Sequence, residues 1–370
     1  MSALPIDPFI VPQIYYWAVF LVCLFLFFNY SGSDNCDKLL QQNSMVPALI
    51  LTLLLMVYMG LRPVSSAFGD TINYAAGYRR AAGMAVFSLD LNKEWLWAAI
   101  MLFCKQSGLT VNAWFLLIEI GYLGFAFIGL RILLKENCWI AMLFFLSAFS
   151  TFTFGVNGIR NGLACSMVIC AFAVAANQNF SKLALAGVIL LLAFGIHRSI
   201  SLPIAAFLAA SYVIKSPKIA IYFWIASIGV SLVAGGAVTN FFMGLGFDDR
   251  MTQYGTGMGE FGDQFSNTGF RWDFIIYSSF PIILGYYTII KKGFTDKTYS
   301  LLLNTYIFSN AFWVLINSAA YSNRFAYLSW FLFPILIAYP ICKFRIFPRQ
   351  GIVACLILFI SIAFTFVMQI

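Results

Sequence analysis

The chain has 370 residues, of which 62% are hydrophobic and only 10% are charged, and its mean hydropathy is +0.87. A soluble domain carries charge at roughly a quarter of its positions to keep its surface wet, so this composition excludes that class. The net charge of +8 is spread along the chain rather than clustered, so no nucleic-acid partner is expected.

The apolar residues come in continuous runs long enough for an α-helix to cross a hydrocarbon layer of about 30 Å. Continuous runs exclude the alternating pattern of a membrane β-barrel. The sequence therefore predicts an all-α polytopic integral membrane protein, folded as a single transmembrane domain over residues 1–370. We expect about twelve transmembrane helices, at residues 14–30, 46–61, 113–131, 139–154, 158–176, 183–195, 201–214, 219–234, 274–290, 301–316, 325–339 and 352–367.

A further apolar stretch at residues 95–104 is short and is flanked by Lys93, Glu94 and Lys105. Its length predicts a re-entrant or interfacial helix rather than a full crossing. The eight cysteines show no metal-ligand spacing, so neither a metal nor a cofactor is expected.

Basic residues mark every second connection from Arg131 to the end of the chain. They are Arg131, Lys135, Lys182, Lys215, Lys218, Lys291, Lys292, Lys297, Lys343, Arg345 and Arg349. Cytoplasmic loops are rich in Lys and Arg, so these connections are predicted to be cytoplasmic. The intervening connections, including the loops at 62–94 and 239–271, are then predicted to be extracytoplasmic.

Four arginines and the only histidine fall on the predicted extracytoplasmic side. Arg62 follows the second span, Arg160 lies at the mouth of a span, His197 and Arg198 separate two apolar runs, and Arg324 opens a late span. An arginine beside hydrocarbon costs a few kcal/mol unless it reaches water or a partner. Any one of them can snorkel to the interface. Four on one predicted face favour a receptor for phosphate oxygens, which guanidinium groups bind bidentately.

His197 is preceded by Gly195 and followed by Pro203, a pattern that predicts a broken helix. A lone histidine on an apolar face is often a hydrogen-bonded structural group. In an exposed break, its ring can instead accept a proton or donate a hydrogen bond to a phosphate.

The two long polar loops carry the remaining candidates. In the first, Asp70, Tyr74 and Tyr78 share one helical face and Glu94 follows. Carboxylates and rings suit a sugar-binding surface, and equally an ordinary amphipathic helix. The second loop is rich in glycine and ends at Arg271; it is either a lid over a site or a plain connection.

Several of these residues form short motifs that resemble one family. Leu61-Arg62 with Gly69-Asp70 and Tyr74 is similar to the first motif, and Glu94 before a short apolar helix is similar to the next. The segment Asn157-Gly158-Ile159-Arg160-Asn161-Gly162-Leu163-Ala164 is very close to the family's signature, with Asn161 where the family has Gln. The segments Ile196-His197-Arg198-Ser199 and Asn323-Arg324-Phe325-Ala326-Tyr327 are similar to its later motifs. The chain thus resembles the EpsG-like group of Wzy-type polysaccharide polymerases, over residues 61–330.

The resemblance implies a fold similar to membrane C-type glycosyltransferases. It also implies a polymerase in the bacterial inner membrane that joins undecaprenyl-pyrophosphate-linked oligosaccharide repeat units at the periplasmic face, for O-antigen or a similar surface glycan. A chain-length regulator is a further expected partner, beside the lipid bilayer.

The expected roles follow from this chemistry. Arginines stabilise the charge of the pyrophosphate leaving group, and a base takes a proton from the acceptor sugar. We expect Asp70, His197 and Arg160 to be catalytic, with Asp70 as first choice of base and Glu94 second. Substrate-binding residues are expected to be Arg62, Tyr74, Glu94, Asn157, Arg198, Arg271, Arg324 and Tyr327.

Two other functions stay open on the sequence alone. An O-antigen ligase or other membrane transferase also needs Arg and His beside a pyrophosphate, and a membrane acyltransferase also needs one base in an apolar setting. A lipid-linked glycan flippase or transporter would bind the same substrates. Repeat symmetry and mid-span charges would favour a transporter.

Overall fold

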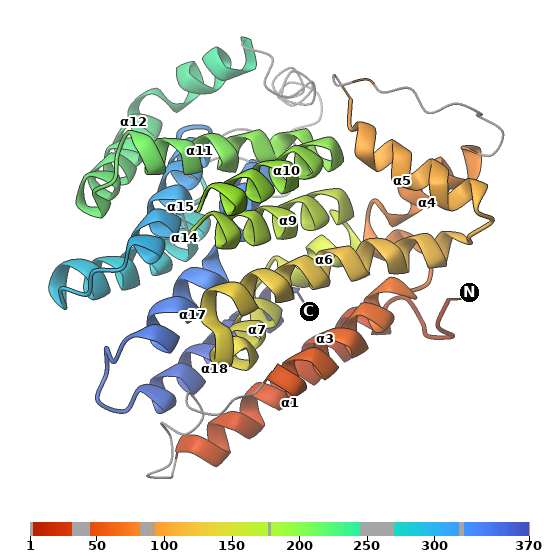
Figure 1. Cartoon of the computed structure of the whole chain (residues 1–370), viewed down its shortest axis with the longest axis horizontal. Helices are drawn as coiled ribbons and strands as arrows, with labels where there is room; N and C mark the ends of the chain where they lie inside the picture. The colour runs from red at the N-terminus through yellow and green to blue at the C-terminus, as the bar shows by residue number, and fades with distance from the viewer. Residues whose placement is uncertain are drawn as a thin grey trace. The chain divides into compact units, whose positions relative to one another are not determined.

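The computed structural model describes residues 3–31, 45–81, 90, 93–176, 179–244, 270–317 and 322–369 (Figure 1). All regular structure within these ranges is helical. The chain forms two compact units. The first comprises Met1–Ile200 and Ala338–Ile370, and the second comprises Ser201–Ile337.

The helices of the first unit are α1 (Ile10–Ser31), α3 (Met45–Gly60), α4 (Thr71–Arg80), α5 (Trp95–Gln106), α6 (Val111–Leu134), α7 (Cys138–Ser147), α8 (Thr151–Val156), α9 (Ile159–Ala175), α10 (Phe180–Ile196) and α18 (Gln350–Gln369). Its short 3₁₀ turns are η1 (Ser66–Phe68), η2 (Lys135–Asn137) and η3 (Arg198–Ile200). The second unit holds α11 (Ser201–Tyr212), α12 (Pro217–Gly244), α14 (Trp272–Gly285), the π-helical η5 (Tyr286–Lys291), α15 (Lys297–Leu315) and α16 (Asn323–Trp330). Helix α17 (Phe333–Lys343) runs from the second unit into the first.

Each predicted span coincides with helical structure, but fewer helices than expected are long enough to cross a bilayer. Six segments among the described residues combine the necessary length and apolarity: α1, α6, α12, α14 with η5, α16 with α17, and α18. Helices α3, α7, α9 and α10 are apolar but shorter. Six spans are therefore supported among the described residues, and the predicted number of about twelve is not confirmed. Helix α15 has 19 residues, but polar side chains lower its hydropathy.

The core of the first unit is built around α9, which lies between α6 and α10 (Figure 1). Every residue of α9 from Gly162 to Ala175 is buried. Close packing depends on small residues, as it commonly does between membrane helices. A Cβ added at Gly129 on α6 would lie only 2.7 Å from Ile169 Cγ2 and 3.1 Å from the backbone nitrogen of Cys170 on α9. This close approach packs the C-terminal half of α9 against α6.

The predicted span 139–154 is broken, because α7 ends at Ser147 and α8 begins at Thr151. Backbone carbonyls released by such a break need new donors in an apolar environment. The carbonyl of Leu146 accepts from Tyr15 Oη at 2.8 Å, and the carbonyl of Ser147 accepts from Thr365 Oγ1 at 2.9 Å. The carbonyl of Phe145 accepts from Thr151 Oγ1. Side chains of α1, α8 and α18 therefore make the break compatible with burial.

The second unit packs around α15, whose polar side chains form a connected buried network. Asn310 accepts from Trp224 Nε1 at 2.8 Å and donates to Ser278 Oγ at 3.1 Å and to Ser329 Oγ at 2.9 Å. Trp330 Nε1 also donates to Ser278 Oγ, at 2.8 Å. The network joins α12, α14, α15 and α16, and each of these bonds satisfies a buried polar atom.

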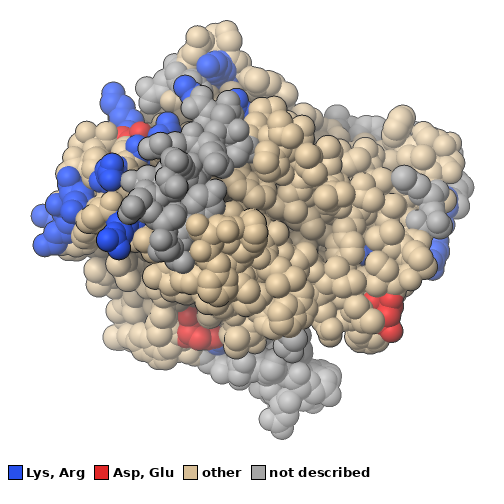
Figure 2. Space-filling model, turned by 90° about the horizontal axis from the view of Figure 1, so that it is seen from below, with Lys and Arg blue, Asp and Glu red and all other residues tan. Residues whose placement is uncertain are grey.

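Large apolar side chains are exposed along helices of both units, as expected for surfaces that face lipid. Phe25 on α1 is 66% exposed, Val233 on α12 is 91% exposed and Ile283 on α14 is 60% exposed. Figure 2 shows a face on which broad areas carry neither acidic nor basic side chains. A surface of this kind is costly in water and stable in a bilayer. The chain is therefore an integral membrane protein.

Candidate functional site

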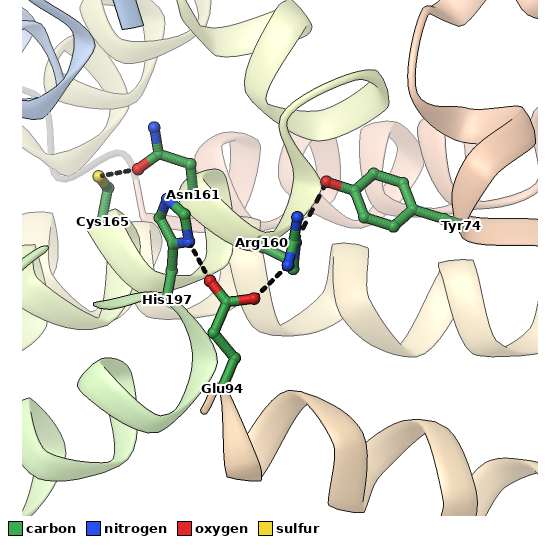
Figure 3. Close-up of polar contacts among 6 residues, drawn as sticks. All are labelled: Tyr74, Glu94, Arg160, Asn161, Cys165 and His197. Atoms are coloured by element: carbon green, nitrogen blue, oxygen red, sulfur yellow. Dashed lines mark hydrogen bonds and ion pairs between the residues drawn. The ribbon is translucent and has the colours of Figure 1, made fainter. Parts of the chain in front are cut away.

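A single carboxylate joins side chains from three helices of the first unit. Glu94 immediately precedes α5, Arg160 is the second residue of α9, and His197 directly follows α10. One oxygen of Glu94 accepts from Arg160 Nη1, and the other lies 2.5 Å from His197 Nδ1 (Figure 3). Glu94 therefore lies between the arginine and the histidine and holds both.

Tyr74 on α4 adds a fourth side chain to this cluster. Arg160 Nε donates to Tyr74 Oη at 3.4 Å, and the guanidinium carbon lies 5.4 Å from the centroid of the tyrosine ring. Figure 3 shows Tyr74 approaching Arg160 from the side opposite Glu94 and His197. We call Tyr74, Glu94, Arg160 and His197 the Glu94 cluster. Glu94 contacts Nη1 of Arg160 and Tyr74 contacts Nε, so Nη2 can reach a further group.

The local backbone explains how His197 comes to face Glu94. His197 has extended backbone angles, φ −151° and ψ 116°, and the short turn η3 follows before α11 begins. The break predicted from Gly195 and Pro203 is confirmed. Gly195 also allows α10 to approach α5, because a Cβ there would lie 2.6 Å from the ring of Trp95. This approach places the end of α10 beside Glu94.

The Glu94 cluster is partly enclosed and not fully buried. The exposed fraction of the side chain is 28% for Arg160, 18% for Glu94 and 10% for His197. Charged hydrogen bonds in such surroundings are less screened than those on an open surface. A substrate group can still reach the guanidinium, the most exposed of the three.

The pKa values of two members are shifted in opposite directions. Burial raises the pKa of the Glu94 carboxyl, but hydrogen bonds and charge interactions with His197 and Arg160 outweigh burial, so its pKa lies below the ordinary value of 4.5. Burial raises the pKa of Tyr74 above 10.0, although Arg160 acts against that rise. At neutral pH, Glu94 is therefore ionised and Tyr74 is a neutral phenol.

A second set of contacts joins residues 69–71 to residues 156–157. It is formed by carbonyl, amide and hydroxyl groups. The backbone N–H of Asp70 donates to Asn157 Oδ1 at 2.8 Å, and Thr71 Oγ1 donates to the carbonyl of Val156 at 2.6 Å. The Asp70 carboxylate accepts from Asn73 at 3.1 Å. Asp70 thus lies one helical turn before Tyr74 and is not in contact with Glu94, Arg160 or His197.

Arg62 is 1% exposed, and its guanidinium donates hydrogen bonds to neutral groups of the same unit. Nη1 donates to the carbonyl of Met59 at 2.9 Å, while Nη2 donates to the carbonyl of Val156 at 3.1 Å and to Thr71 Oγ1 at 3.3 Å. The ring of Phe115 lies 4.7 Å from the guanidinium carbon. Arg62 is therefore enclosed by protein, and its hydrogen bonds go to groups outside the Glu94 cluster.

The remaining predicted residues have other surroundings. Arg198 is exposed in η3, directly after His197. In the second unit, Arg271 precedes α14 and pairs with Asp273, with Nε 2.9 Å from Oδ1 and Nη2 2.5 Å from Oδ2. Arg324 is exposed near the start of α16. Tyr327, one turn later, packs edge-on against Trp330, with ring centroids 5.3 Å apart.

Parts of the two predicted loops lie outside the described residues: 82–89 and 91–92 of the first, and 245–269 of the second. Within the first loop, Tyr78 stacks on Trp114 and donates its hydroxyl to the carbonyl of Leu109 at 2.8 Å. Residues 239–244 of the second loop are helical and belong to α12. A glycine-rich lid thus remains a prediction from the sequence.

The sequence reasoning missed Glu119, an acidic residue inside the long apolar helix α6. Its side chain is 1% exposed, and neither carboxyl oxygen has a hydrogen-bond partner within the described residues. It lies against Gly155, where an added Cβ would be 2.6 Å from Glu119 Oε1. A lone acid inside an apolar span was a usable signal, because such residues are costly in a membrane. Among the described residues, no group of acidic, histidine and cysteine side chains could hold a metal.

The fold and the cluster together define a helical integral membrane protein with a polar site at the ends of its helices. Comparison with known families matches residues 45–370 to the EpsG family, and the chain belongs to that family. The resemblance inferred from the short motifs is thereby confirmed. No curated protein and no solved structure gives a significant match. Family membership indicates a membrane polysaccharide polymerase with glycosyltransferase-like activity.

Proposed function

We propose that the protein is a Wzy-type polymerase that joins undecaprenyl-pyrophosphate-linked oligosaccharide repeat units at the periplasmic face of the bacterial inner membrane. The observation that carries the proposal is the shared carboxylate of Glu94, which holds a histidine and an arginine together. This arrangement supplies a proton acceptor and a donor for phosphate oxygens side by side, as glycosyl transfer from a pyrophosphate requires.

His197 is the proposed general base. With Nδ1–H donated to Glu94, the lone pair of the neutral ring lies on Nε2, the nitrogen that can take a proton. A hydroxyl oxygen of the acceptor sugar attacks the anomeric carbon of the growing chain, and its proton passes to Nε2. The bond from the anomeric carbon to the phosphate oxygen breaks, and its electron pair leaves with undecaprenyl pyrophosphate. This assignment is proposed in place of Asp70 as the base, because the Asp70 side chain makes no hydrogen bond or ion pair with Glu94, Arg160 or His197.

Arg160 is the proposed donor to the leaving group. Its charge is partly balanced by Glu94 before substrate binds, and Nη2 is directed to no partner within the described residues. A guanidinium stays charged at all relevant pH values and can bind the developing pyrophosphate as its negative charge increases. Tyr74 fixes the orientation of the guanidinium by accepting from Nε.

Other residues stay proposed for substrate binding. Arg198 follows the base in the sequence and is exposed, so it can add positive charge for a pyrophosphate. Arg324 and Tyr327 are retained as proposed substrate-binding residues because they lie in a motif that resembles the family's, and Arg271 is retained because it ends the second predicted loop. A chain-length regulator is retained as a proposed partner.

The proposal is tested by replacing the chromosomal gene with variants and examining the surface glycan on a gel. We expect three variants to give glycan molecules with a single repeat unit and no ladder of longer chains: Arg160→Ala, His197→Gln and Arg324→Ala. Loss of the base should lower the rate of polymerisation by at least about 100-fold. Arg79→Ala, which removes an exposed charge at the end of α4, is the matched control and should give a normal ladder.

Three results would count against the proposal. Loss of every repeat unit, including the first, would point to a flippase, which acts before polymerisation, or to a ligase, which acts after it. An unchanged ladder in Arg160→Ala and His197→Gln would exclude these residues from the reaction. Full activity of Arg160→Lys would show that the planar guanidinium is not needed.

A further inference from the structure

The second set of contacts lies beside the first residues of α9, the helix that carries Arg160. Helix α8 ends at Val156 and α9 begins at Ile159, so residues 156–158 form a turn that we call the elbow. The amides of Asn157 and Gly158 both donate to the carbonyl of Thr153, at 2.9 Å and 3.0 Å. The elbow determines where α9 begins, and therefore where the guanidinium of Arg160 lies.

Three side chains attach the elbow to the segment before α4. The carbonyl of Val156 accepts from both Thr71 Oγ1 and Arg62 Nη2, while Asn157 Oδ1 accepts from the backbone N–H of Asp70. Gly69 makes the last contact possible. Its φ is +56°, and a Cβ there would lie 2.5 Å from Asn157 Oδ1.

Arg62 also connects the elbow to the end of α3 and the start of α6. Its Nη1 donates to the carbonyl of Met59, and its own carbonyl accepts from Asn112 Nδ2 at 2.9 Å. Thr71 is 0% exposed and Arg62 is 1% exposed, so neither presents its polar group to a substrate. A charged residue this enclosed is used for internal hydrogen bonding.

We infer that Arg62, Thr71 and Asn157 are positioning residues that fix the start of α9 relative to α4, and thereby hold Arg160 against Tyr74 and Glu94. The two helix starts are thus joined twice, once through the elbow and once through the bond from Arg160 to Tyr74. This role replaces the substrate contacts that the motifs led us to expect for Arg62 and Asn157. The catalytic consequence rests on the proposed function, whereas the structural consequence does not.

The structural arm uses hydrogen–deuterium exchange of the full-length protein in lipid nanodiscs, followed by mass spectrometry of peptides that cover the elbow. Thr71→Val keeps the shape of the side chain but removes its hydroxyl, and Thr71→Ser keeps the hydroxyl. Thr71→Val and Arg62→Lys should increase exchange at Asn157 and Gly158 by about fivefold, the factor expected for the net loss of one hydrogen bond. Thr71→Ser and the exposed control Arg79→Ala should exchange as the wild type does.

The activity arm uses lipid-linked oligosaccharides extracted from the membranes of a polymerase-deleted strain. Thr71→Val should lower the maximal rate by about fivefold or more and leave the half-saturating concentration unchanged. The reason is that a misplaced guanidinium loses more of its stabilisation of the transition state than of the bound substrate. Thr71→Ser should restore the rate. A change confined to the half-saturating concentration would overturn the inference and indicate substrate binding.

The two arms separate failure of the inference from failure of the proposed function. Unchanged exchange in both Thr71→Val and Arg62→Lys would overturn the positioning role, whatever the activity. Faster exchange with an unchanged maximal rate would also overturn it, because the elbow would then not govern Arg160. If Arg160→Ala remained active, the proposed function would fail, and the exchange data would still decide whether these residues hold the elbow.

Discussion

Glu94 combines two interactions that depend on its charge. Its oxygens contact a guanidinium and an imidazole, and together these partners hold its pKa below 4.5 despite burial. A depressed carboxyl pKa means that the folded protein favours the ionised form. The resulting stability is fully present above the unfolded pKa and is lost as the pH falls through the folded value.

The first residue-scale prediction concerns this pH dependence. Glu94→Gln keeps the size of the side chain and removes its charge, so we expect it to lower the free energy of unfolding at neutral pH. The difference from the wild type should shrink as the pH falls below about 4.5, where the wild-type carboxyl also becomes neutral. Thermal unfolding of the purified protein in detergent, followed from pH 7 downward, measures this difference.

A neighbouring acidic residue provides the control for this measurement. Asp90 pairs with Lys93 at 3.2 Å, and the two side chains are 36% and 81% exposed. Exposed pairs contribute little, so Asp90→Asn should change stability by less than about 1 kcal/mol. If Glu94→Gln behaved like Asp90→Asn at every pH, the charge of Glu94 would have no part in holding the cluster.

Glu119 differs from Glu94 although both are acidic residues in an enclosed setting. Glu94 has two charged or polar partners, whereas the oxygens of Glu119 have no hydrogen-bond partner within the described residues. An ionised carboxylate without donors is expensive in an apolar interior. Glu119 lies beside Gly155 and forms no ion pair within the described residues, although its carboxyl and the Arg62 guanidinium interact electrostatically.

At the scale of elements, the second unit depends on how α15 meets its neighbours. In a membrane, apolar side chains of neighbouring helices gain little by leaving lipid, so packing and hydrogen bonds between helices decide the arrangement. Asn310 supplies three such bonds, to α12, α14 and α16. Asn304 on the same helix supplies one, to the carbonyl of Ile214 at 3.2 Å.

This difference leads to a prediction about two asparagines that are equally buried. Asn310→Ala leaves several buried partners without their bonds and should lower the free energy of unfolding by about 1–3 kcal/mol. Asn304→Ala removes one bond and should have the smaller effect. Thermal unfolding of both variants in the same detergent gives the comparison. Equal losses would show that helix packing, rather than the network around Asn310, determines the stability of this unit.

At the scale of the whole molecule, the apolar runs were sufficient to predict where helices occur. Each predicted span contains helix because an apolar run in lipid must satisfy its own backbone. The same runs did not reveal the breaks. Helix α7 stops at Ser147 because side chains on α1, α8 and α18 supply donors for its last carbonyls, and those residues are distant in the sequence.

The site was only partly predictable for the same reason. Arg160 and His197 were identifiable, since polar groups at the ends of apolar runs stand out in the sequence. Their shared partner Glu94 is 103 residues from His197, and no local pattern links the two. Arg62 also stood out, but its enclosure by Met59, Thr71 and Val156 is a property of the folded chain. The sequence therefore indicated which polar residues lie near the site. The fold was needed to tell the members of the Glu94 cluster from the residues that hold it in place.

The orientation of the whole molecule provides the last prediction. The distribution of basic residues predicts that Lys182, in the first turn of α10, is cytoplasmic and that α4, which carries Tyr74 and Arg79, is extracytoplasmic. In a background with the native cysteines replaced by alanine, Arg79→Cys should react with a membrane-impermeant maleimide in intact spheroplasts. Lys182→Cys should react only after permeabilisation. Both positions are exposed, so accessibility within the fold does not limit either reaction. The opposite pattern would place the Glu94 cluster on the cytoplasmic side of the membrane, and the proposed periplasmic polymerisation would be wrong.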